Sequence, residues 1–191
     1  MKEYNLFPTP VMEFDFTNHP DLPKVLDIVD QLKIGPHNLL KNGGSSYSTS
    51  DRILFSPDLI NLKNDFQKCV DNYSNKLSIK STIIQDNWVN ILENQGEVEI
   101  HHHWSSVISA AFYPLLEENT CNLCFRSPIH TAVNFRPING DTYGHFQNDF
   151  IMPIKQNHLY LFPGWLQHYT EANKGNKRIV ISFNTEFYRY I

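Results

Sequence analysis

Hydrophobic residues recur at spacings of three and four in two segments of the first half of the chain, as they do along one face of an α-helix. In residues 21–32 these positions are Leu22, Val25, Leu26, Val29 and Leu32, and in residues 56–77 they are Leu59, Leu62, Phe66, Cys69, Val70, Tyr73 and Leu77. Asp21 stands where an N-cap is expected, and Ser56 followed by Pro57 is typical of the start of the second segment. The pattern predicts two amphipathic helices, the second packed against a sheet.

From Ser81 onward the pattern changes to short runs rich in valine, isoleucine, threonine and aromatic residues, separated by turn residues. Such runs are typical of an antiparallel sandwich or barrel. We therefore expect a mainly β protein, with a jelly-roll core over about residues 81–191 and a helical part over about residues 1–80. A chain of 191 residues is long enough for one sizeable core and short for two, so a single domain over residues 1–191 is expected.

Two connections have the composition of loops. Residues 41–51, KNGGSSYSTSD, combine glycines with small hydroxylic residues, which favours either a flexible linker or an ordered loop near the mouth of a site. Residues 130–150 form a second long connection. Because long connections on a rigid β core usually carry selectivity, we expect substrate contacts from both.

Charge and composition exclude some classes of protein. The net charge is −4, and the sixteen basic residues are scattered, so there is no nucleic-acid footprint. No stretch approaches the ~20 apolar residues that cross a bilayer, so no membrane partner and a cytoplasmic location are expected. The three cysteines favour reduced thiols, and Cys121 and Cys124, three apart on a predicted strand, should point to opposite faces instead of sharing a zinc ion.

Three consecutive histidines stand at the end of the segment EVEIHHH. On an extended strand alternate side chains share a face, so His101 and His103 point one way with Glu97 and Glu99, while His102 points the other way. Two imidazoles side by side can bind one metal ion, with a third ligand from elsewhere. Five other histidines lack a paired spacing and are expected to be surface or hydrogen-bonded residues: His19, His37, His130, His145 and His158.

The third ligand is expected from His168. If NKG (residues 173–175) is a hairpin loop, His168 lies opposite Val180 and shares a face with Arg178, roughly 8 Å away along the backbone. A metal ion at His168 and the guanidinium of Arg178 would then hold the two ends of a small dicarboxylate.

Six short motifs follow one another along the chain: LFPTPV (6–11), NGGSSYS (42–48), NWVN (87–90), HHHWSSVISAAFY (101–113), LFPGWLQH (161–168) and RIVISFN (178–184). Each is weak alone, but their order resembles the 2-oxoglutarate- and iron(II)-dependent oxygenase superfamily, and within it a group of bacterial and phage oxygenases. The resemblance covers nearly the whole chain. It implies a double-stranded β-helix of the cupin-like jelly-roll type, with iron bound between two sheets.

The resemblance also implies an iron site made of His101, His103 and His168, which are then the catalytic metal ligands. His101 and His103 match the first two ligands of the family, and His168 matches the distal histidine. The familiar triad has two histidines and one carboxylate, so His103 stands where a carboxylate is usual. Glu99, on the same predicted face, is the nearest carboxylate that could take its place.

For the cosubstrate, 2-oxoglutarate, the resemblance implies that Arg178 binds the far carboxylate. Ser182 shares the face of Arg178 and is a candidate for a hydrogen bond to the same carboxylate, whereas Val180 stands where an Arg-x-Ser pattern has serine. Asn90 and Tyr113, from neighbouring motifs, are further cosubstrate candidates.

The leading hypothesis is an Fe(II)- and 2-oxoglutarate-dependent dioxygenase that hydroxylates an unidentified primary substrate and releases succinate and CO2. One alternative is a zinc-dependent hydrolase or lyase, because three histidines plus water are also a catalytic zinc pattern, with Glu99 as the general base. The other is a non-enzymatic jelly-roll binding module. The sequence leaves the primary substrate open, and a homodimer is compatible with it.

Overall fold

The computed structural model describes residues 2, 9–49, 51–128 and 149–187. Its two α-helices are α1 (Leu22–Val29) and α2 (Ile60–Lys76), and its short 3-10 helices are η1 (Tyr47–Thr49), η2 (Ile53–Phe55) and η3 (Pro57–Leu59). Its strands are β1 (Met12–Asp15), β2 (Leu40–Ser45), β3 (Thr82–Val98), β4 (Ile108–Leu116), β5 (Leu123–Arg126), β6 (Asp149–Met152), β7 (His158–Pro163), β8 (His168–Tyr169) and β9 (Lys177–Phe187). Within these residues no helix is long and apolar enough to cross a membrane.

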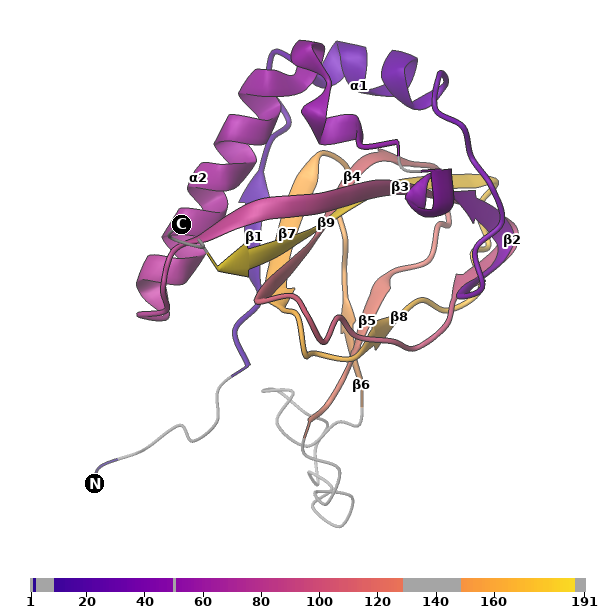
Figure 1. Ribbon diagram of the computed structural model, residues 1–191. Coiled ribbons are helices and arrows are strands. Elements are labelled where there is room, and N and C mark those ends of the chain that lie inside the picture. Colours follow the sequence, from indigo (N-terminus) through magenta and orange to yellow (C-terminus); the bar gives the residue numbers. More distant parts are fainter. Residues whose placement is uncertain (1, 3–8, 50, 129–148, 188–191) are drawn as a thin grey trace.

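The strands form two antiparallel sheets. The larger has the order β1-β7-β4-β9-β3-β2, and the smaller has the order β6-β5-β8. Figure 1 shows both helices lying along one side of the larger sheet, with the smaller sheet on the other side. This is the predicted mainly β architecture, with an addition: β1 and β2 come from the part predicted to be helical, and both extend the larger sheet.

Strand alternation divides the larger sheet between two hydrophobic clusters. On β4, Ala110 and Phe112 join the cluster beneath the helices, whereas Ala111 and Tyr113 face the smaller sheet. The helix-facing cluster includes the predicted apolar stripe of α2, in which Leu62, Phe66, Val70 and Tyr73 are buried. Because the inner face of the larger sheet meets the smaller sheet, polar side chains on that face are enclosed between the two sheets.

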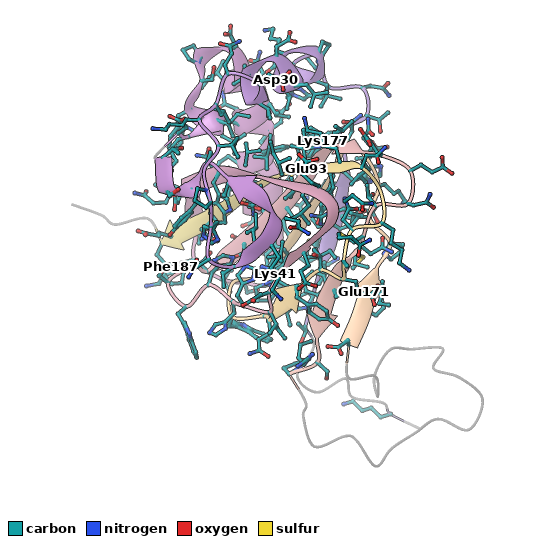
Figure 2. The ribbon with its side chains drawn as sticks, turned by 90° about the vertical axis from the view of Figure 1, so that its right-hand side faces the viewer. Asp30, Lys41, Glu93, Glu171, Lys177 and Phe187 are labelled. Atoms are coloured by element: carbon teal, nitrogen blue, oxygen red, sulfur yellow. The ribbon has the colours of Figure 1, made fainter. Side chains whose placement is uncertain are left out.

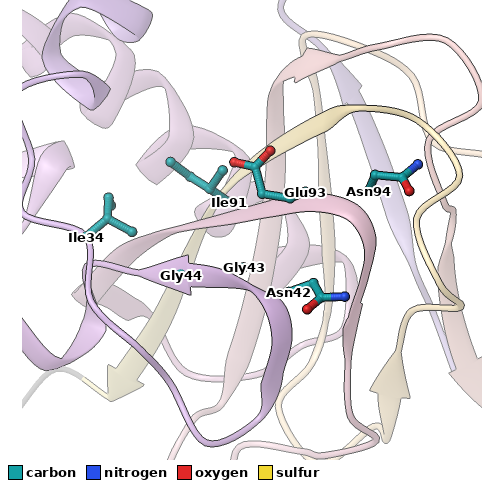
Figure 3. Close-up of a pocket in the computed structure, with 7 residues that line it drawn as sticks. All are labelled: Ile34, Asn42, Gly43, Gly44, Ile91, Glu93 and Asn94. Atoms are coloured by element: carbon teal, nitrogen blue, oxygen red, sulfur yellow. The ribbon is translucent and has the colours of Figure 1, made fainter.

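The edge strand β2 takes up Lys41–Ser45 of the segment predicted to be a loop. Lys41–Ser45 pairs with β3 and Tyr47–Thr49 forms η1, so these residues are a paired strand and a helical turn instead of the predicted linker or loop. Gly43 permits the pairing; Figure 3 shows Gly43 and Gly44 on β2 beside Ile91. A Cβ atom on Gly43 would lie 2.4 Å from the carbonyl oxygen of Ile91, so a side chain here would separate the two strands.

Asp21 is the N-cap residue of α1, as predicted, but its side chain caps the first turn of α2. Its side chain makes no capping hydrogen bond within α1, and the backbone N–H of Leu62 in the first turn of α2 donates to its Oδ2 atom (3.0 Å). The carboxylate is only 3 % exposed and satisfies an N–H group that the helix cannot pair itself. It also lies near the positive end of the α2 dipole.

Replacing Asp21 by alanine is expected to lower the free energy of unfolding by about 1–3 kcal/mol, because a buried N–H group of α2 loses its acceptor. Urea denaturation followed by circular dichroism measures the change. Asp27→Ala, on the exposed side of α1, is the matched control and should change stability by no more than about 0.5 kcal/mol. Equal stability of the two variants would show that the Asp21 contact contributes nothing.

Candidate metal centre

Three histidines from different parts of the chain meet between the two sheets. His101 and His103 follow the end of β3, and His168 begins β8. One nitrogen from each ring lies within 4.8 Å of the other two, and the ring centroids of His101 and His168 are 4.3 Å apart. This separation allows the three rings to bind one ion.

Backbone carbonyl groups fix the proton on two of these rings. The Nδ1 atom of His101 lies 2.8 Å from the carbonyl oxygen of Glu99, and that of His168 lies 2.9 Å from the carbonyl oxygen of Leu166. A carbonyl oxygen only accepts, so each Nδ1 carries the proton and donates it. The lone pair is left on Nε2 in both rings, which is the arrangement common among metal-binding histidines.

Burial keeps the rings neutral. Burial first, and then the neighbouring His101 and His102, lower the pKa of His103 to about 4. Burial also lowers the pKa of His101 and takes the pKa of His168 well below its usual value. At neutral pH all three rings therefore have lone pairs available for a cation.

The alternation predicted for EVEIHHH holds for the histidines and fails for the glutamates. β3 ends at Val98, and beyond it His101 forms an isolated bridge with His168. The Glu99 carboxylate lies 3.6 Å from Lys41 Nζ, with 49 % of its side chain exposed, on the surface where Figure 2 labels Lys41. Glu99 therefore lies outside the histidine cluster. It is placed neither as a metal ligand nor as the general base of a zinc enzyme.

The predicted hairpin register of His168 and Arg178 is wrong. β9 pairs with β3 and β4, so Arg178 lies opposite Leu92 and Leu116 in the sheet and is not paired with Thr170. Figure 2 labels the next cross-strand pair, Glu93 and Lys177. The segment before β9 crosses to the other sheet, because β8 pairs with β5.

Asn173 holds this crossing in place. It is fully buried and exchanges backbone hydrogen bonds with Gly96 and Gln95. Its side-chain oxygen accepts from the N–H of Cys121 (3.1 Å), and its amide donates to the carbonyl of Glu93 (3.1 Å). His168 and Arg178 therefore approach the same cavity from facing sheets.

Arg178 is a buried cation without a buried anion. It is 2 % exposed and makes no ion pair with a carboxylate in the described parts of the chain. Its Nη2 donates to the Tyr113 hydroxyl (3.2 Å), and Nε has no hydrogen-bond partner there. Burying an unpaired guanidinium is costly, so this position fits an anionic ligand.

One cavity unites the predicted site. It is lined by the three histidines and by all four predicted cosubstrate residues: Asn90, Tyr113, Arg178 and Ser182. Three aromatic residues that the sequence analysis did not single out, Trp88, Phe162 and Tyr169, also line it. The ring centroids of Trp88 and His103 are 5.7 Å apart, and those of Phe162 and His168 are 4.8 Å apart. The histidine end of the cavity therefore has apolar walls.

The remaining histidines divide as follows. His19 contacts Asp65 (3.2 Å) and His158 contacts Glu13 (2.8 Å), whereas the ring of His37 packs on Tyr47. His130, His145 and nearly all of the predicted selectivity segment 130–150 lie outside the described residues. The three cysteines are free, and burial raises the pKa of Cys124.

The sequence matches one family model, described as "Putative 2OG-Fe(II) oxygenase", over residues 86–184. The match covers more than half of the chain and includes the three clustered histidines and Arg178. Among curated proteins no sequence matches.

Several solved structures share the fold. HygX from Streptomyces hygroscopicus, with nickel and 2-oxoglutarate bound, has a TM-score of 0.68 at 11 % identity, covering 95 % of this chain and 84 % of that one. An oxidoreductase of the 2OG-Fe(II) oxygenase family from Burkholderia pseudomallei has a TM-score of 0.65 at 9 % identity, covering 92 % and 84 %. A prolyl-4-hydroxylase from Pseudomonas putida has 0.64 at 8 %, covering 94 % of each chain. These similarities confirm the predicted jelly-roll fold.

The depressed pKa of His103 predicts a pH-dependent stability of the metal-free protein. The unfolded chain takes up a proton at His103 near pH 6.5, whereas the folded protein does so only near pH 4, so acid favours the unfolded state between these values. His103→Asn removes this proton uptake, and its stability should fall by about 1–3 kcal/mol less than wild type from pH 7 to 4. Chemical denaturation in chelator at several pH values tests this; parallel curves for the two proteins would contradict it.

Proposed function

Because the chain belongs to the 2-oxoglutarate- and Fe(II)-dependent oxygenase family, we propose that its three clustered histidines hold the iron and that Arg178 binds the far carboxylate of 2-oxoglutarate. The proposed reaction is hydroxylation of a C–H bond in a primary substrate. When bound, iron and 2-oxoglutarate supply the oxidising chemistry, in which O2 and 2-oxoglutarate are consumed and succinate and CO2 are released.

The donor set supports Fe(II) binding. Neutral imidazole nitrogens suit first-row transition metals, and three protein ligands leave coordination positions for other molecules. His103 replaces the carboxylate of the familiar triad, so these ligands remove no charge from the ion. The neutral set favours a dianionic cosubstrate, because the ion and Arg178 then carry all the positive charge of the cavity.

The single observation that carries the proposal is the buried Arg178 guanidinium in the same cavity as the histidines. Its planar donors match a carboxylate, and the unpartnered Nε has an N–H group available for it. Tyr113, whose hydroxyl accepts from Nη2, holds the guanidinium in position. A dicarboxylate would neutralise Arg178 at one end and bind a metal ion at the other.

Two further polar groups support the placement of 2-oxoglutarate. Ser182 lines the cavity on the same face of β9 as Arg178 and carries a hydroxyl donor. Asn90 also lines the cavity, and its buried Oδ1 has no hydrogen-bond partner among the described residues. A half-turn of that amide would present an N–H donor instead, which is what a carboxylate requires.

The other side chains exclude water and position the substrate. Trp88 and Phe162 form apolar walls beside the histidines, which strengthens electrostatic contacts inside the cavity.

The three free thiols, all in reduced form, support a cytoplasmic location.

Turnover tests the proposed reaction. Anaerobically prepared protein loaded with Fe(II) and given carbon-labelled 2-oxoglutarate and O2 should form labelled succinate, and His168→Ala should abolish both metal binding and succinate formation. Absence of 2-oxoglutarate binding by the iron-loaded protein, together with absence of succinate across a broad substrate panel, would overturn the proposal.

Arg178→Met is expected to raise the Kd of 2-oxoglutarate roughly 100-fold while leaving metal affinity unchanged, because a buried charge-assisted contact to the carboxylate is lost. Calorimetric titration of 2-oxoglutarate into the metal-loaded protein under anaerobic conditions measures it.

Arg126→Met is the matched control. Arg126 lies on β5 and pairs with Asp149 (2.7 Å), so its replacement should change the Kd of 2-oxoglutarate by no more than about 3-fold. Equal Kd values for the two variants would remove Arg178 from the cosubstrate site.

A further inference from the structure

Strand β9 extends the polar face of the cavity beyond Ser182. Arg178, Val180 and Ser182 line the cavity at alternate positions, and Asn184 is the next residue on that face. The Asn184 side chain contacts His103, with Nδ2 3.5 Å from the ring Nδ1, which is long for a hydrogen bond. The cavity-facing side of β9 therefore has Arg178 at one end and Asn184, in contact with His103, at the other.

The partner of His103 differs in kind from those of the other two rings. His101 and His168 face backbone carbonyl groups, which can only accept a proton. Asn184 offers an amide, which presents an oxygen or an NH2 group depending on a half-turn about its last torsion. The proton position on His103 therefore depends on which way this amide points.

Only one orientation leaves Nε2 of His103 free. When the amide nitrogen faces His103, it donates to Nδ1, and the single proton of the neutral ring must sit on Nε2. When the amide oxygen faces the ring, Nδ1–H donates to it, and the Nε2 lone pair is available, as in His101 and His168.

We infer that Asn184 is a positioning residue that makes His103 a metal ligand, by accepting the Nδ1 proton through its amide oxygen. The inference rests on the proposed function, since it assumes that His103 binds the metal. Metal binding selects this orientation, because the other one places a proton where the ion would bind.

A serine pair permits both orientations. Ser109 Oγ lies 2.8 Å from the Asn184 amide and 3.3 Å from Ser106 Oγ. With the amide oxygen toward Ser109, the serine hydroxyl donates to it. With the amide nitrogen toward Ser109, that nitrogen donates to Oγ, and Ser109 donates to Ser106, whose own proton goes to the carbonyl of Ile108 (2.7 Å). Every polar atom keeps a partner, so the half-turn leaves no buried group unsatisfied.

Two substitutions separate this role from simple packing. Asn184→Leu keeps the volume and removes the acceptor, so the affinity for Co(II), used as an oxygen-stable probe, should fall roughly 10–100-fold. Asn184→Asp presents only acceptor oxygens, so it should bind Co(II) at least as tightly as wild type. Calorimetric titration with Co(II) measures both, and circular dichroism confirms the fold.

The same changes at Asn72, on the exposed face of α2, are the controls and should leave Co(II) affinity unchanged. A direct readout uses wild-type protein labelled with 15N-histidine and loaded with Zn(II). Its nitrogen chemical shifts should show His103 with the proton on Nδ1, and metal-free Asn184→Asp should show the same form. This measurement decides the question even if Asn184→Leu fails to fold.

His103→Ala distinguishes failure of the inference from failure of the proposed function. If His103→Ala loses Co(II) affinity, and either Asn184→Leu binds like wild type or the loaded His103 ring carries its proton on Nε2, the role of Asn184 is wrong and the site stands. If His103→Ala also binds Co(II) like wild type, the proposed iron site itself is wrong.

Discussion

Two backbone hydrogen bonds between His101 and His168 are the constraint on which the candidate metal centre depends. Each residue donates its N–H to the carbonyl of the other, at 3.0 and 2.9 Å. His101 belongs to the segment that leaves the larger sheet, and His168 begins a strand of the smaller one, so this bridge joins the sheets at the point where a metal would bind. The backbone therefore brings the imidazoles of His101 and His168 together.

The bridge between His101 and His168 stabilises the folded state, whereas burying the charge of Arg178 destabilises it. The histidine rings are neutral when buried, whereas the guanidinium is a charge placed between two sheets with one phenol as its described polar side-chain partner. The hydrophobic clusters on both sides of the larger sheet provide the stability that offsets this cost. A ligand that supplies the missing carboxylate would both bind the protein and stabilise it.

Much of the site could be predicted from local alternation, and the parts that depend on distant contacts could not. The pairing of His101 with His103 and the shared face of Arg178 and Ser182 follow from the period of a strand, and the structure places all four around one cavity. The hairpin prediction failed because buried Asn173 directs the chain across to the other sheet. Strand β2 was not predicted because LKNGGS has no apolar alternation, and its glycines act through close backbone approach. Asn184 stood in a recognised motif, but only contact with His103 gives it a role.

In the proposed site, His103 as a ligand in place of a carboxylate would move negative charge from the protein to the cosubstrate. A divalent ion held by three neutral rings keeps its full charge, and Arg178 adds another, so the cavity presents three positive charges to a dicarboxylate where a carboxylate ligand would leave two. The neutral ligand has a requirement that a carboxylate lacks, since a carboxylate offers lone pairs in any orientation while an imidazole must carry its proton on the nitrogen away from the ion. A stronger electrostatic attraction for 2-oxoglutarate thus comes with a need for a proton acceptor behind the ring. The amide of Asn184 contacts His103 Nδ1, and with its oxygen toward the ring it would be that acceptor.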